Sequence, residues 1–196
     1  MLKFEGMEPI AKEVLGLGMA KAILQIQSVA ASELMVVPVP LFRARQRRRG
    51  FNQAALLAQA GIDVLRRDQP AWKLTLNASA LERVRDTHEL YPLAPHLRRA
   101  ALRGAFRVTD AVAVRGREVL LIDDILTTGA TARECTRVLL RAGASKVWVA
   151  TWARTVETEG NTGVAFWNAA PRQASRSSHD RMLQDRVSRG RNSQPG

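Results

Sequence analysis

Apolar residues recur at helical spacing in two segments of the N-terminal part of the chain. Residues at this spacing lie on one face of a helix, so each segment predicts one amphipathic helix. The first is expected from about Glu8 to Val29. The second follows Asn52, whose side chain can cap a helix N-terminus. The apolar positions are Ile10, Val14, Leu17 and Leu24 in the first segment and Leu56, Leu57, Ala60 and Val64 in the second.

Continuous apolar runs predict buried strands between helices, and a further helix is expected from Ala132 to Arg141. Alternation of helices and apolar strands predicts an α/β fold with a mainly parallel sheet and helices on both faces. Ligands of such sheets bind at the carboxyl ends of the strands, where Pro40 and Asp123 both fall. The apolar runs are Leu34–Pro40, Val119–Ile122 and Val147–Trp152.

The signals between these strands are weaker. Leu74 to Val84 predicts one or two short strands, and Arg85 to Pro95 reads as a long loop because it holds two prolines. A short helix is expected at His96–Arg103 and a strand at Ala105–Val108.

The hydrophobic pattern stops at Val156. The remaining residues are rich in Gly, Asn, Ser and Arg and hold one apolar island, Val164–Trp167. We therefore predict one domain over residues 1–155 and an irregular basic tail over residues 156–196, disordered from Gln173 onward.

The amino-acid composition indicates that the protein binds anionic partners. The chain has 196 residues, of which 46% are hydrophobic, and 30 basic against 18 acidic residues give a net charge of +12. Much of this excess lies in the tail and in a run of arginines at Arg43–Arg49, which we expect to form a basic loop. Such charge favours pyrophosphate, nucleic acid or both.

The only cysteine, Cys135, excludes an intrachain disulfide and a four-cysteine zinc site. A lone cysteine and the charges that interrupt the N-terminal helix predict a cytoplasmic protein without a membrane span. Cys135 is expected to be a small core residue rather than a nucleophile. Trp148 and Trp152 share one strand face, where we favour core packing over base stacking.

The stretch from Asp123 to Thr131 carries the most specific chemistry. A buried strand leads into two acids, a loop of hydroxyls and small residues, and then a helix. Backbone N–H groups at a helix N-terminus favour a phosphate, and Gly129 allows a close backbone approach. The two carboxylates can accept hydrogen bonds from sugar hydroxyls or hold a divalent metal. Together these features predict a site for a phosphorylated sugar.

This stretch resembles the phosphoribosyl-pyrophosphate motif of type I phosphoribosyltransferases: an apolar strand, two acids and Thr-Thr-Gly-x-Thr. The resemblance implies that Asp123 and Asp124 hold the ribose hydroxyls. It also implies Mg²⁺ with the pyrophosphate, which the same two carboxylates would contact indirectly. The residues assigned to the 5′-phosphate are Thr127, Thr128, Gly129, Ala130 and Thr131.

Two further stretches resemble the ComF-type branch of that family. One is Val37–Ala54, with Pro-x-Pro, the arginine run and Arg-Gly-Phe-Asn-Gln; the other combines Arg85-Asp86-Thr87 with Gly104-Ala105-Phe106. The matches run from about Lys3 to Thr155. The resemblance implies anion contacts to the departing pyrophosphate from Arg43, Arg45, Arg47, Arg49 and Arg85.

The chain departs from the ComF pattern in three places. Members of that family usually begin with a cysteine-rich zinc ribbon, whereas Met1 onward resembles the family's middle, so the start is either truncated or has lost the ribbon. Leu90 stands where the family often has Gln, and Ala101 where it often has Asn. Both changes remove polar groups near the expected site and bear on whether the protein is catalytically active.

Two functions from different classes remain open. The first is a phosphoribosyltransferase that exchanges pyrophosphate for a nucleophile at the anomeric carbon of ribose. The second is a non-catalytic module that binds a nucleotide or single-stranded DNA in competence-related DNA uptake, as the resemblance implies. Binding of phosphoribosyl pyrophosphate with turnover would favour the first, and steep salt dependence without turnover the second. The sequence does not identify the substrate that would accept the phosphoribosyl group. It also leaves the oligomeric state open, and a homo-oligomer is one of the alternatives.

Overall fold

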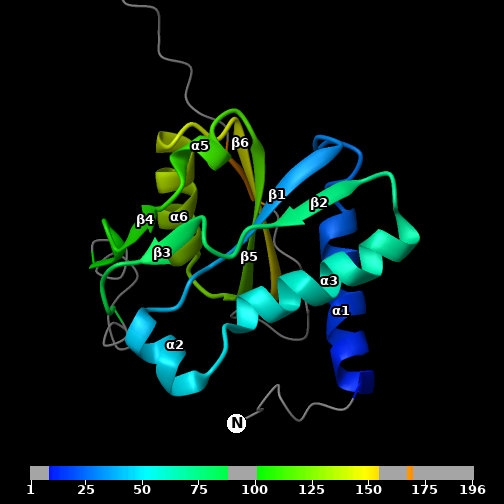
Figure 1. The fold of residues 1–196 in the computed structure, drawn as a ribbon, viewed down its shortest axis with the longest axis horizontal. Helices are drawn as coiled ribbons and strands as arrows, with labels where there is room; N and C mark the ends of the chain where they lie inside the picture. Colours follow the sequence, from blue (N-terminus) through cyan, green and yellow to red (C-terminus); the bar gives the residue numbers. More distant parts are fainter. Residues whose placement is uncertain (1–8, 88–100, 155–166, 170–196) are drawn as a thin grey trace, which may run out of the picture.

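The computed structural model describes residues 9–87, 101–154 and 167–169, and Figure 1 shows the arrangement of their elements. The helices are α1 (Pro9–Leu24), α2 (Arg43–Arg49), α3 (Gln53–Asp68), α5 (Ala111–Val114) and α6 (Ala130–Arg141). The strands are β1 (Glu33–Pro38), β2 (Lys73–Leu76), β3 (Leu81–Arg83), β4 (Phe106–Val108), β5 (Glu118–Leu126), β6 (Lys146–Arg154) and β7 (Trp167–Ala169).

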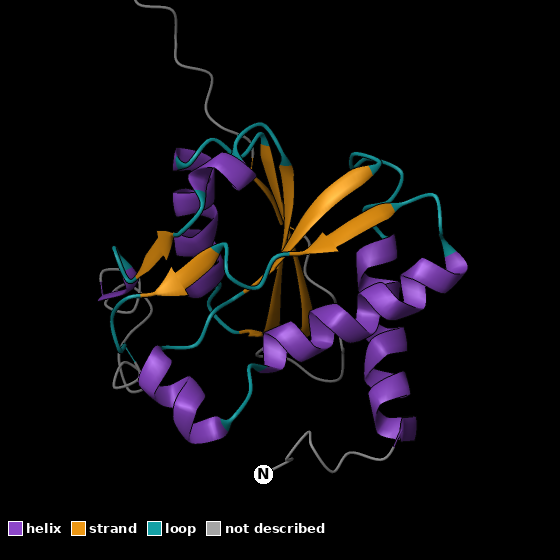
Figure 2. Ribbon diagram, viewed as in Figure 1, coloured by secondary structure: helices purple, strands orange, loops and turns teal. Residues whose placement is uncertain are grey.

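The main sheet has the strand order β2-β1-β5-β6-β7. The pairs β1–β2, β1–β5 and β5–β6 are parallel, and only the edge pair β6–β7 is antiparallel. Strands β3 and β4 form a separate antiparallel hairpin. Figure 2 shows this hairpin apart from the central strands. The predicted mainly parallel α/β sheet is thus confirmed.

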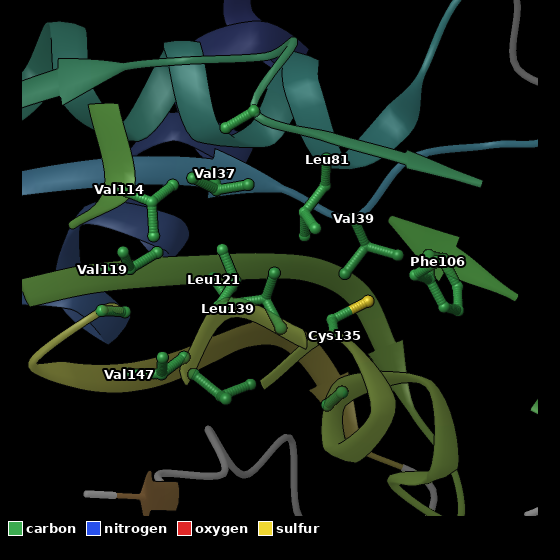
Figure 3. Packing of buried hydrophobic residues seen from close by; sticks show 14 of the residues in the cluster. Val37, Val39, Leu81, Phe106, Val114, Val119, Leu121, Cys135, Leu139 and Val147 are labelled. Atoms are coloured by element: carbon green, nitrogen blue, oxygen red, sulfur yellow. The ribbon is translucent and has the colours of Figure 1, made fainter. Parts of the chain in front are cut away.

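Helices cover both faces of the sheet because successive strand residues point to opposite sides. Along β5, Val119 and Leu121 pack towards α6, in the cluster shown in Figure 3. Leu120 and Ile122 instead join the cluster formed with α1 and α3. Cys135 has no exposed surface within the α6 cluster, which confirms it as a core residue.

Of the two tryptophans of β6, Trp148 is a core residue as expected, and Trp152 is partly buried. Trp148 is 5% exposed, and Trp152 packs against the cluster formed with α1 and α3.

Several predicted boundaries are confirmed by specific contacts. The side chain of Asn52 caps α3, since its Oδ1 accepts a hydrogen bond from the N–H of Ala54 at 3.0 Å. The same side chain donates to the carbonyl of Val39 at 3.0 Å and thereby ties α3 to the end of β1. The ambiguous stretch from Leu74 resolves into β2 and β3, and the expected strand near Ala105 is β4.

Other boundaries differ from the prediction. Helix α1 ends at Leu24 rather than Val29, because the next N–H groups bond three residues back instead of four, as Gln27 does to Leu24. Strand β5 continues beyond Ile122 to Leu126, and α6 begins at Ala130 rather than Ala132.

The arginine run is a helix and not the expected loop. Arginine is a good helix former, and Gly50 ends α2 in the left-handed conformation with φ of 84°. No residue of α2 is fully buried: Arg43, Arg47 and Arg48 are exposed, whereas Arg45 and Arg49 are partly buried.

Strand β7 was not predicted; it begins at Trp167, the last residue of the apolar island. It lies within the stretch assigned to the tail, where Trp148 pairs with Asn168. The expected loop and helix between Arg85 and Arg103 fall largely on residues 88–100, outside the described residues, as do residues 170–196 of the tail. The boundary at residue 155 stays a prediction. None of the helices in the described ranges is both long and apolar enough to cross a membrane.

Glu118 connects three segments at the amino-terminal end of β5. Its Oε2 accepts hydrogen bonds from the N–H of Ala31 at 3.1 Å and from the indole Nε1 of Trp148 at 2.8 Å. The Lys146 ammonium lies 4.3 Å from the centroid of the same indole ring. One carboxylate therefore joins β5 and β6 to the loop before β1.

We predict that Glu118→Ala lowers the free energy of unfolding by about 1–3 kcal/mol, because it leaves the buried Trp148 N–H without its acceptor. Urea unfolding followed by circular dichroism measures this change. Glu33→Ala is the control, since Glu33 pairs with Lys73 through side chains that are 67% and 70% exposed. Equal stability of both variants would show that the Glu118 contacts contribute nothing.

Candidate functional site

A cleft of about 260 Å³ opens at the carboxyl end of β5. Its walls come from segments far apart in the sequence: the β5–α6 loop, α2, the residues around β3, and Leu102 before β4. The cleft therefore lies where the parallel sheet was expected to bind a ligand, beside Asp123.

The loop expected to hold a phosphate lines this cleft in full, from Thr127 to Thr131. Gly129 takes the left-handed conformation, with φ of 67°, at the position before α6. No side chain caps the start of α6 among the described residues. The first N–H groups of this helix can thus bond to a phosphate oxygen, with the helix dipole adding to the attraction.

The two acids of the motif differ in whether they line the cleft. Asp123 is half-buried and lines the cleft, whereas Asp124 is not among the lining residues. Alternation along β5 places Asp123 on the face of Leu121 and Asp124 on the opposite face, yet the Asp124 carboxyl lies close enough to affect the pKa values of both Asp123 and Arg45. The backbone N–H of Asp124 donates to Oδ1 of Asp123 at 3.0 Å.

Burial raises the pKa of Asp123 to about 8, and the neighbouring Asp124 carboxylate adds to the increase. The nearby Arg83 guanidinium opposes this increase without cancelling it. Burial therefore favours the protonated form of the Asp123 carboxyl in the ligand-free protein.

The predicted arginines take different positions. Arg45 lines the cleft, whereas Arg47 and Arg49 do not. Arg43 forms an ion pair with Glu82 at 3.0 Å, with its own side chain 76% exposed. Arg85 donates through Nη2 to the carbonyls of Ala101 and Arg103, and it is absent from the cleft wall.

Arg83 lines the cleft and was missed in the sequence. Its guanidinium lies 5.4 Å from the centroid of the Phe106 ring and donates to the hydroxyl of Thr87. A signal was present: in β3, Leu81 points to the core and Arg83 is two residues later, so both face inward. Glu82 between them faces outward towards Arg43 and Arg107.

A turn before β4 supplies another part of the wall. Ala101, in place of the family's Asn, contributes its carbonyl to Arg85, and the adjacent Leu102 lines the cleft. The N–H of Gly104 donates to Glu134 on α6 at 2.7 Å. Leu90, the other departure, lies outside the described residues.

For a metal ion, the described residues offer no group of three or more His, Cys, Asp or Glu side chains. Asp123 and Asp124 are hard oxygen donors of the kind Mg²⁺ prefers. A Mg²⁺ ion held here would take its other ligands from water and phosphate oxygens, which is how this ion usually binds.

These features define an α/β protein with a cleft at the end of its parallel sheet, lined by the Thr127–Thr131 loop, two guanidinium groups and the Asp123 carboxyl group. No family model matches the chain. DNA utilization protein YhgH from Escherichia coli (strain K12) is 38% identical over 121 residues, which are 62% of this chain and 49% of that protein. Competence protein F from Haemophilus influenzae is 38% identical over 117 residues, 58% of this chain and 47% of that protein.

Competence protein ComFC from Bacillus subtilis is 33% identical over 111 residues, 56% of this chain and 39% of that protein. The chain is thus a relative of the ComF-type proteins that its motifs resemble. It spans about half the length of the curated relatives from E. coli that it matches.

Solved structures that align with the chain include hypoxanthine phosphoribosyltransferase from Staphylococcus aureus, with a TM-score of 0.47 and 13% identity over 77% of this chain and 70% of that chain. A hypoxanthine-guanine phosphoribosyltransferase from Bacillus anthracis aligns with a TM-score of 0.48 and 13% identity over 77% of this chain and 76% of that chain.

We predict that Asp123→Asn raises the melting temperature relative to the wild type more at pH 8 than at pH 5. In the unfolded chain the Asp123 carboxyl has an ordinary pKa of about 4, so it loses its proton at a lower pH there than in the native state. The native state keeps the proton until about pH 8, so the wild type loses stability as the pH rises through this window. Asn does not titrate. Thermal melts at both pH values measure the difference, and an offset independent of pH would contradict the prediction.

Proposed function

We propose that this protein binds phosphoribosyl pyrophosphate or a related ribose 5-phosphate ligand in the cleft, as a phosphoribosyltransferase-type protein. The observation that carries the proposal is the presence of Asp123, the loop Thr127–Thr131 and Arg45 in one cleft. A carboxylate for sugar hydroxyls, an N–H-rich loop for a phosphate and a guanidinium for a second anion match the parts of this ligand.

In this proposal the 5′-phosphate binds at the start of α6. Backbone N–H groups and the hydroxyls of Thr127, Thr128 and Thr131 would donate to its oxygens, and the left-handed Gly129 lets the backbone turn around it. Asp123 would accept hydrogen bonds from the ribose hydroxyls, with Asp124 beside it on β5.

Mg²⁺ would be held by Asp123 and Asp124 through the ribose hydroxyls, and it would neutralise pyrophosphate charge. The chain itself would orient the sugar and attract the departing pyrophosphate, through Arg45 in the cleft. Positioning and charge stabilisation then supply the rate, because an oxocarbenium-like centre needs no protein nucleophile. A lone buried Cys135 supports a cytoplasmic setting for this chemistry.

A second candidate is binding of single-stranded DNA, with or without catalysis. Helix α2 supports it, because its seven residues include five arginines and none is buried. Arginines one turn apart repel each other, and a phosphate backbone would relieve this repulsion. The relatives named for competence and DNA utilization support a role in DNA uptake.

The proposed ribose site is tested with the double variant Asp123→Asn, Asp124→Asn. We expect its affinity for ribose 5-phosphate to fall by about 100-fold or more, since charged acceptors are lost from both hydroxyl contacts. Isothermal titration calorimetry measures the affinity, and an unchanged circular dichroism spectrum shows that the fold is retained. If the variant binds ribose 5-phosphate with wild-type affinity, the two acids are not part of the ribose site.

The DNA candidate is tested with Arg47→Gln plus Arg48→Gln on α2, outside the cleft wall. If α2 tracks a DNA backbone, the slope of log affinity against log salt should flatten by up to about 1.4 units, since each single-strand phosphate contact contributes about 0.7. Arg66→Gln plus Arg67→Gln, near the end of α3, is a control with the same charge change. Fluorescence anisotropy titrations measure the slope for both double variants. If the two variants change it equally, DNA does not bind preferentially at α2.

A further inference from the structure

A buried hydroxyl group near the carboxyl end of β6 has no hydrogen-bond partner. The side chain of Thr151 has no exposed surface, and its Oγ1 atom bonds to no group among the described residues. Buried polar groups are nearly always hydrogen-bonded in proteins, so an unpaired one requires an explanation. A threonine hydroxyl can donate one hydrogen bond, and rotation about a single bond redirects it.

The strand register places Thr151 beside Asp123. Strands β5 and β6 pair in parallel, with Asp123 opposite Thr151. Both residues point to the face covered by α6, because Leu121 and Val149, each two residues earlier in its strand, belong to the cluster around α6. Adjacent strands lie only about 4.8 Å apart, so the Thr151 hydroxyl and the Asp123 carboxyl start from neighbouring positions. The carboxyl lines the cleft, whereas the hydroxyl is shielded from solvent behind it.

The other groups near this carboxyl leave a place for one more donor. Oδ1 of Asp123 accepts the N–H of Asp124, but an ionised carboxylate accepts at both of its oxygens. The Asp124 carboxyl also lies close, and an ionised carboxylate cannot donate. Burial raises the pKa of the Cys135 thiol on α6, and the nearby Asp123 adds to the increase. A thiol is a weak donor, so Thr151 is better suited to bond to the carboxylate.

We propose that Thr151 is a positioning residue of the cleft, whose hydroxyl donates to the Asp123 carboxylate from the buried side and orients it to accept the ribose hydroxyls. The ribose part of this inference rests on the proposed function. The contact between the two side chains rests on the strand register and on the unpaired Oγ1. Thr151 does not line the cleft, so it acts on a ligand only through Asp123.

The test uses Thr151→Val, which removes the hydroxyl and keeps the shape of the side chain. Thr136→Val is the matched control, since Thr136 is 3% exposed, its Oγ1 is also unpaired among the described residues, and it lies on α6 rather than beside Asp123 in the sheet. Calorimetric titrations with ribose 5-phosphate and inorganic phosphate measure the affinities. We expect Thr151→Val to weaken ribose 5-phosphate by about 10-fold and to leave inorganic phosphate unchanged. Thr151→Ser, which keeps the hydroxyl, should bind as the wild type does, and Thr136→Val should change neither affinity.

A second measurement needs no ligand. The NMR chemical shift of the Asp123 carboxyl carbon, recorded with this group ionised, should change in Thr151→Val but not in Thr151→Ser or Thr136→Val. Thr151→Ala provides the same comparison if Thr151→Val fails to fold.

An unchanged chemical shift in Thr151→Val would overturn the inference, as would equal effects of Thr151→Val and Thr136→Val on the affinity for ribose 5-phosphate, or a Thr151→Ser variant as weak as Thr151→Val. Wild-type protein that does not bind ribose 5-phosphate, but whose Asp123 chemical shift depends on the Thr151 hydroxyl, would overturn the proposed function and leave the contact between the two side chains standing.

Discussion

The parallel pairing of β1 with β5 is the constraint on which the site depends. It aligns Pro38 with Ile122, and the N–H of Val39 continues the pairing with a 2.8 Å bond to the carbonyl of Ile122. Parallel strands end at the same edge of a sheet, so the chain leaving β1 and the acids ending β5 emerge together. Arg45 of helix α2 and the Thr127–Thr131 loop line one cleft because these two strands pair.

The charged groups of the cleft lower the stability of the ligand-free fold. The half-buried carboxyl of Asp123 and the guanidinium groups with unpaired Nε atoms are each unfavourable in the ligand-free protein. Such features persist at functional sites, where a ligand supplies the missing partner. The apolar clusters on the two faces of the sheet stabilise the fold and offset the unfavourable free energy of these charged groups.

Glu134 links the two sides of the cleft mechanically. Burial would raise its pKa, but hydrogen bonds from Arg137 and the Gly104 N–H outweigh burial and lower it. The ionised carboxylate thereby holds the turn with Leu102 against α6, the helix that follows the loop lining the cleft. This contribution to stability is present at neutral pH and is lost as the pH falls through the lowered pKa of Glu134.

The sequence by itself determined the features that depend on neighbouring residues. These include the strand, loop and helix around Gly129, the Asn52 cap and the apolar core faces, because periodicity, capping and turn chemistry act over a few residues. Only the tertiary structure decided which charged groups face the cleft. Arg83 lines it while Arg85 bonds to a turn, and Asp123 lines it while Asp124 does not. Those choices depend on strand register and on contacts between distant segments, such as Phe42 with Arg83, which local pattern does not encode.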